Sequence, residues 1–205
     1  GKADEIIKKT EKIMKKMNKE HPILTGSEDL PLATIMAMLP GDPDALVEEM
    51  ENCYELLKKE FPMHKNAVQG LCQVLTMSSQ AAEDKCQKVM AIFNALKERK
   101  DKFGKDTEIA ALGSLVDLDM DAAAIADEIG EASRLLKEHK GFGNFRLGKE
   151  YRAMFAAFEV ADVFGGEQKP DSSILGSSIA VVIAEEIMIA LIAASTAAAA
   201  SSSTN

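Results

Sequence analysis

The spacing of Asp117, Asp119, Asp121 and Glu128 is the feature of this sequence that most resembles a metal site. Carboxylates at alternate positions, closed by a glutamate at the twelfth position, are the ligands of a calcium-binding loop. The sixth position is Ala122, however, where the sharp turn of such a loop requires glycine. We therefore interpret the aspartates as N-caps in a turn between helices. These four residues are weak metal candidates, and we expect no metal.

A second motif suggests phosphate chemistry. Residues 143–149 read GNFRLGK, which fits the spacing of a phosphate-binding loop. Glu150 stands where such a loop has a Mg²⁺-binding serine or threonine, and no strand-like segment precedes the motif. An acid at this point would repel a phosphate. We interpret the segment as a glycine-rich connection between helices and expect no nucleotide or other cofactor.

The stretch LTGSEDLPLATIMAM places two acids, Glu28 and Asp29, between a turn and an apolar helix. Ser27 is well placed to cap that helix, and the acids suit the positive end of its dipole. Asp106 and Glu108 precede another apolar segment in the same way. The sequence therefore predicts helix starts at both places, without a catalytic role.

The histidines and cysteines show no spacing typical of a catalytic or metal site. No histidine has an acid or a cysteine at ligand spacing on its own helix, and no CxxC pair occurs. We expect reduced thiols, in the core or half-buried, in a cytoplasmic protein. These residues propose no catalytic pair, so the sequence favours a protein that is not an enzyme but leaves the question open. The residues concerned are His21, His64, His139, Cys53, Cys72 and Cys86.

Composition limits the fold and the partners. The chain has 205 residues, no tryptophan and 5% aromatic residues, and its net charge is −9. Helix-favouring residues dominate, and no stretch alternates with the two-residue period of a strand. Because nucleic-acid binding needs clustered basic residues, we expect no nucleic-acid partner.

The elements that would position these residues recur along the chain. Lys-Glu occurs at 19–20, 59–60, 97–98 and 137–138, a period of about 39 residues. We predict an all-α protein of nine helices, in which α-α hairpins stack as a short α-solenoid. Each unit would pair a short helix with the longer one that follows. The predicted helices are 2–19, 29–39, 43–59, 66–77, 80–100, 105–116, 120–139, 148–162 and 174–198.

Residues 1–205 are expected to form a single domain, with a frayed tail at 201–205. The helix at 2–19 would be the second helix of a unit whose first helix is absent. The chain would then be the C-terminal part of a longer protein.

The apolar helix over 177–200 is long enough to span a bilayer. Glu185 and Glu186 oppose this, because each costs about 2.5–3.5 kcal/mol near the bilayer centre. We interpret the segment as a core helix and do not expect a membrane partner.

Three stretches carry a family resemblance: KEHPILTGSEDLPLATIMAM, GDPDALVEEMENCYELL and the alanine-rich C-terminal helix. Through them the chain resembles, from about residue 5 to 195, the bacterial family of domain of unknown function 4003. The resemblance implies a cytosolic helical protein and transfers no catalytic residue.

Three functions follow as hypotheses. The first is a non-catalytic scaffold that binds a protein or peptide on its concave face. The second is a small-molecule-binding protein or enzyme with a cavity between helices, using acids such as Glu185 or Glu186. The third is membrane association through the C-terminal apolar helix.

Overall fold

The computed structural model describes residues 1–99, 103–140, 142–143, 148–165 and 179–183, and these are all-helical with no strand among them. Seven α-helices and two 3-10 helices, η1 and η2, occupy the described part of the chain, and residues 179–183 are helical as well. The elements are α1 (Lys2–Glu20), η1 (Ser27–Asp29), α2 (Leu30–Met38), α3 (Pro43–Leu57), α4 (Lys65–Leu75), α5 (Ala82–Glu98), η2 (Thr107–Leu115), α6 (Ala122–Glu138) and α7 (Gly148–Gly165).

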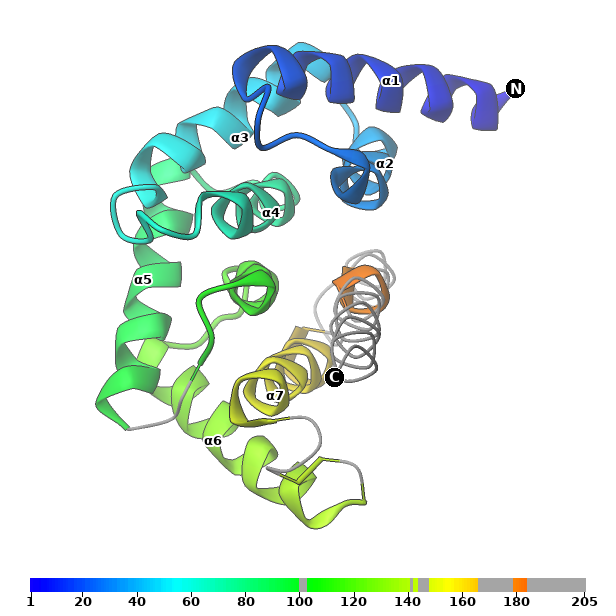
Figure 1. The fold of residues 1–205 in the computed structure, drawn as a ribbon. Helices are drawn as coiled ribbons and strands as arrows, with labels where there is room; N and C mark the ends of the chain where they lie inside the picture. Colours follow the sequence, from blue (N-terminus) through cyan, green and yellow to red (C-terminus); the bar gives the residue numbers. More distant parts are fainter. Residues whose placement is uncertain (100–102, 141, 144–147, 166–178, 184–205) are drawn as a thin grey trace, which may run out of the picture.

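The helices lie in two rows (Figure 1). One row, which we call the outer row, holds α1, α3, α5 and α6, with α1 packed on α3, α3 on α5 and α5 on α6. The other row holds α2, α4, η2 and α7, each in contact with the next. The ribbon curves so that the second row lies on the inner side of the bend (Figure 1). We call this second row the inner row.

The contacts between rows differ from the predicted hairpins. The sequence-based interpretation paired each short helix with the long helix after it. In the structure each outer-row helix instead contacts the inner-row helix that follows it, as α1–α2, α3–α4, α5–η2 and α6–α7. Helix α1 is therefore paired with α2 and does not stand alone.

The helix predicted at 105–116 is a 3-10 helix, η2, and it is buried on nearly all sides. Its apolar residues Ile109, Leu112 and Leu115 recur every three residues, which places them on one face of a helix with three residues per turn. Gly113 faces α4 on another side. A Cβ built there would lie 2.7 Å from Val74 Cγ1, so only glycine permits this close approach.

Helix starts behave largely as predicted. Asp42 caps α3 by accepting a hydrogen bond from the Asp44 N–H, and Pro43 follows in the first turn. The described part of the predicted C-terminal helix is 179–183, where Ile179 and Ile183 are buried. The remainder of that helix, and the tail at 201–205, lie outside the described residues. Among the described helices, none combines the length and apolar character that a membrane crossing needs.

Candidate binding cavity

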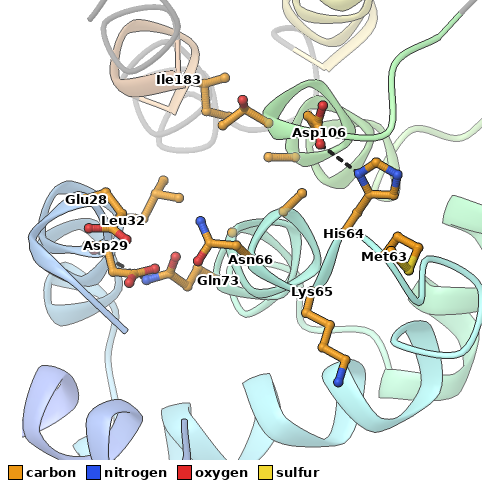
Figure 2. Close-up of a pocket in the computed structure, with 14 residues that line it drawn as sticks. Glu28, Asp29, Leu32, Met63, His64, Lys65, Asn66, Gln73, Asp106 and Ile183 are labelled. Carbon is orange, nitrogen blue, oxygen red and sulfur yellow. Dashed lines mark hydrogen bonds and ion pairs between the residues drawn. The ribbon is translucent and has the colours of Figure 1, made fainter. Parts of the chain in front are cut away.

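A cavity of about 300 Å³ opens between three elements of the inner row (Figure 2). It lies where η1 and α2, the start of α4 and the start of η2 come together, and Ile183 from the 179–183 helix closes one side. Asp29 and Gln73 lie on one side of the space and His64 and Asp106 on another (Figure 2). The polar residues of its wall include Glu28, Asp29, His64, Asn66, Gln73 and Asp106.

Asp29 is the buried carboxylate of this wall, with 5% of its surface exposed. It occupies the N-cap position of α2, and its Oδ2 accepts a hydrogen bond of 2.9 Å from the Gly26 N–H. Its Oδ1 accepts one of 3.0 Å from the amide of Gln69. Ser27 was the predicted cap and makes no such bond, so that prediction was wrong. Asp29, which is nearer to α2, instead accepts the hydrogen bond from the Gly26 N–H across η1.

Burial determines the electrostatics of Asp29. The loss of water around the carboxylate raises its pKa, and the charge of Glu28 adds to the increase. The hydrogen bonds from Gly26 and Gln69 lower the pKa but do not cancel the effect of burial. The carboxylate is therefore a buried negative charge that its neighbours compensate only in part.

Gln73 lies one helical turn beyond Gln69 on α4, and its side chain is fully buried. Its Nε2 makes two long contacts, 3.4 Å to the Asp29 carbonyl and 3.7 Å to Met17 Sδ. Its Oε1 has no hydrogen-bond partner. Because a buried acceptor without a donor costs free energy, this oxygen marks a place where a donor from a ligand would be favoured.

His64 and Asp106 form a pair that only the fold brings together. His64 occupies the N-cap position of α4, and Asp106 that of η2. Their Nδ1 and Oδ1 atoms are 2.7 Å apart, across a sequence separation of 42 residues. The predicted helices left His64 in the connection between 43–59 and 66–77, and Asp106 was predicted at a helix start. The sequence held no sign that the two would meet.

The rim of the cavity carries one acid and one apolar side chain that face water. No hydrogen bond or ion pair reaches the Glu28 carboxylate from the described residues. Met63 is 87% exposed, although it is a large apolar residue. Lys65 also borders the cavity, but Figure 2 shows its chain extending away from Glu28 and Asp29.

The weak metal candidates do not gather around one point. Asp117 accepts hydrogen bonds from Ser78 Oγ at 2.7 Å and Gln80 Nε2 at 2.9 Å. Asp121 caps α6 through the Ala124 N–H, as predicted for an N-cap, whereas Asp117 is bonded to the loop before α5 and caps no helix. Asp119 is exposed, and Glu128 lies within α6. In the described part of the chain, no three acidic, histidine or cysteine side chains are grouped so that they could hold a metal ion.

The other predicted features lie away from the cavity or outside the described residues. Residues 144–147 of the phosphate-loop motif are outside them, and Gly148 begins α7 with φ +81°. Glu185 and Glu186 are also outside them. The three cysteines are free and buried, as predicted, at Cys53, Cys72 and Cys86.

Glu108 repeats part of the arrangement at Asp29. It is 6% exposed in the first turn of η2, and burial raises the pKa of its carboxyl. A Cβ built on Gly104 would lie 2.5 Å from its carboxyl carbon, so the side chain folds back over that glycine. The prediction of an acidic helix start is confirmed here. Its depth of burial was not foreseen.

The sequence analysis missed two glutamines, Gln73 in the cavity wall and Gln69, which donates a hydrogen bond to Asp29. The available signal was the pattern VQGLCQVL, in which two polar residues four apart interrupt an otherwise apolar helix. Residues with this spacing share one helical face. A polar pair on a buried face implies a polar neighbour, and Asp29 is that neighbour.

Comparison with known proteins gives a family and no function. No curated protein matches the chain, and no solved structure matches it. A family model described as "Protein of unknown function (DUF4003)" matches residues 1–190. This range includes the first two stretches on which the resemblance was based, part of the C-terminal helix predicted at 174–198, the residues that line the cavity and all of α1 to α7. The chain therefore belongs to the DUF4003 family.

Proposed function

We propose that this protein is a non-catalytic binding module, a short α-solenoid that holds a segment of a partner protein in the cavity of its inner row. The observation that carries the proposal is the cavity itself. It is lined by residues of α2, α4 and η2, three successive helices of the inner row, and stacked helix repeats use such concave surfaces for binding. We further propose a cytoplasmic location, which the free, buried cysteines support.

The two rows support the solenoid arrangement. Long helices begin at Lys2, Pro43, Ala82 and Ala122, so successive starts are 39 to 41 residues apart. Among α1 to α7, each outer-row helix contacts the next outer-row helix and the inner-row helix that follows it. Such contacts between neighbouring pairs are typical of solenoid proteins, in which no single pair buries its apolar face. Ile183, from the helix after α7, in addition reaches the cavity between α2, α4 and η2.

The size of the cavity favours a side chain over a whole metabolite. Its volume of about 300 Å³ is at the lower end of the range for small-molecule pockets. A segment of protein could insert one side chain there and lie across the exposed residues of the rim, such as Met63. Exposed apolar side chains beside a polar cavity are typical of interaction surfaces.

Site-specific photo-crosslinking in the native cell tests this proposal. A photoreactive residue placed at Asn66, in the cavity wall, is expected to crosslink to one discrete segment of a partner. The same residue at Glu48, an exposed position on α3, is the matched control and should not yield that product. Equal crosslinking from both positions, or none from Asn66, would contradict the proposal.

The His64–Asp106 pair favours a second candidate, a small-molecule-binding protein or enzyme. An aspartate bonded to Nδ1 orients a histidine so that its Nε2 can accept a proton from a bound molecule. Thr107, which follows Asp106 in the sequence and also lines the cavity, carries a hydroxyl. Native mass spectrometry of the purified protein distinguishes the candidates. A retained small molecule that is lost in a His64→Gln variant would favour the second one.

A further inference from the structure

We propose that the cavity binds the side chain of an arginine in the partner segment, with apolar neighbours of that arginine resting on the rim. This inference rests on the proposed binding function and specifies its ligand. It follows from the charges of the wall, from one unsatisfied acceptor and from the exposed apolar side chains next to them.

The charges of the wall favour a cation. Glu28, Asp29 and Asp106 all line the cavity. Asp106 is bonded to His64, but the Glu28 carboxylate has no partner among the described residues. Asp29 is buried with neutral donors only, from Gly26 and Gln69. A bound cation would therefore interact with two carboxylates that lack a positive partner.

The acceptor that points to a ligand is Gln73 Oε1. The side chain of Gln73 is fully buried, lines the cavity and leaves this oxygen without a donor. A guanidinium carries five N–H donors in a fixed plane. It can donate to an amide oxygen and a carboxylate at the same time, whereas the compact ammonium of lysine is less suited to bridging two separate acceptors.

In the described part of the chain, no basic side chain of the cavity wall pairs with Glu28 or Asp29. Lys65 borders the cavity, but its side chain extends away from Glu28 and Asp29 (Figure 2). His64 is turned toward Asp106. The wall also includes the apolar residues Leu32 and Ala110, against which the aliphatic part of an arginine side chain can pack.

The rim indicates that the arginine belongs to a protein segment. Met63 follows Pro62 at the cavity and is 87% exposed. The preceding connection repeats this arrangement, since Ile23 follows Pro22 and is 96% exposed. Of these two residues, Met63 lines the cavity, so it offers an apolar contact to the residues beside an inserted arginine.

Fluorescence anisotropy with a labelled heptapeptide tests the inference. The probe carries a central arginine flanked by leucines, and matched probes carry citrulline or lysine in its place. Citrulline keeps the shape of arginine and removes the charge. We expect the arginine probe to bind the full chain about tenfold or more tightly than the citrulline probe, because the neutral citrulline cannot make the charge-assisted hydrogen bonds of the guanidinium. The lysine probe should be intermediate.

Variants identify the cavity as the site. Glu28→Gln changes an exposed side chain, so the fold should be kept and affinity for the arginine probe should fall about threefold. Gly70→Ala adds a methyl group to the cavity wall, where no atom lies within 4 Å, and should weaken binding further. Glu48→Gln, an exposed acid outside the cavity, is the matched control and should bind like the parent chain.

The outcomes separate this inference from the proposed function. Equal affinity for arginine and citrulline probes, without an effect of Glu28→Gln, would overturn the arginine assignment but leave a peptide-binding role in place. Free arginine competing as strongly as the peptide would show a small-molecule site and overturn the partner segment. An absence of probe binding would overturn the inference, and the Asn66 crosslinks would then decide the proposed function independently.

Discussion

Replacing Gly113 by alanine is expected to destabilise the protein, although alanine ordinarily favours helix. Gly113 is buried in η2 against α4. The new Cβ would lie 2.7 Å from Val74 Cγ1, 3.1 Å from Val74 Cβ and 3.3 Å from Leu71 Cδ1. Val74 is β-branched and stiff about χ1, so it cannot turn away at low cost. The two helices must move apart instead.

The magnitude is the difference between two effects. Overpacking of a well-packed core costs about 1–3 kcal/mol. Alanine recovers about 0.5–1 kcal/mol relative to glycine within a helix. The net loss in the free energy of unfolding is therefore about 1.5 kcal/mol. With a urea m value of about 2 kcal/mol/M, the unfolding midpoint should fall by about 0.7 M.

Gly70→Ala is the matched control, because Gly70 lies in α4 with no atom within 4 Å of its added Cβ. It should raise the midpoint by about 0.4 M. The assay is urea unfolding followed by far-UV circular dichroism, since the chain has no tryptophan. A Gly113→Ala protein at least as stable as the parent chain would refute the close packing of η2 on α4.

Four further predictions concern buried charges, a turn and the thiols. Glu49→Gln should lower the free energy of unfolding by about 3 kcal/mol, because the fully buried Lys85 ammonium loses the carboxylate that lies 2.6 Å away. Lys85→Met should lower it by less, because it removes the buried charge itself. The reverse order of the two variants in thermal or urea unfolding would contradict this reasoning. Because burial raises the pKa of Asp29, its contribution to stability is full below the unfolded-state pKa and is lost as pH rises through the folded-state value. Asp29→Asn should therefore flatten the change of urea midpoint with pH in that window, and unchanged slopes would refute the assignment. Gly41→Ala should lower the free energy of unfolding by about 1–3 kcal/mol, because alanine is strained at the φ of +103° that Gly41 adopts. No atom lies within 4 Å of the added Cβ, so the loss would come from the backbone alone. An unchanged urea midpoint would argue against this turn. All three thiols, including Cys72 whose pKa is raised by burial, should resist a thiol reagent until the chain unfolds, so rapid labelling of the native protein would disagree with their burial.

Local patterns determined much of the helix layout. Helical periodicity and caps located α3 within two residues of its end and α6 within two residues of its start. Asp42 and Pro43 signalled a helix start because a side-chain oxygen can satisfy a free N–H and proline needs none there. Such signals act over a few residues, so they are readable without knowing the rest of the fold.

Helix pairing depended on tertiary packing. The sequence placed each short helix with the long helix after it, whereas the contacts place it with the one before. The period is the same in both frames, so repetition alone cannot tell them apart. The close approach of η2 to α4 at Gly113 likewise joins segments far apart in the sequence, and the helical pattern of residues 105–116 did not reveal it.

The candidate site was decided almost entirely by the tertiary structure. The sequence by itself determined an acidic, helical chain, the family and the acids at two helix starts. The fold decided that Asp29 is buried against Gln69 and that His64 meets Asp106, pairs separated by 40 and 42 residues. A side chain's charge and shape are properties of its residue, but its burial and partners depend on segments that only the packing of helices brings together.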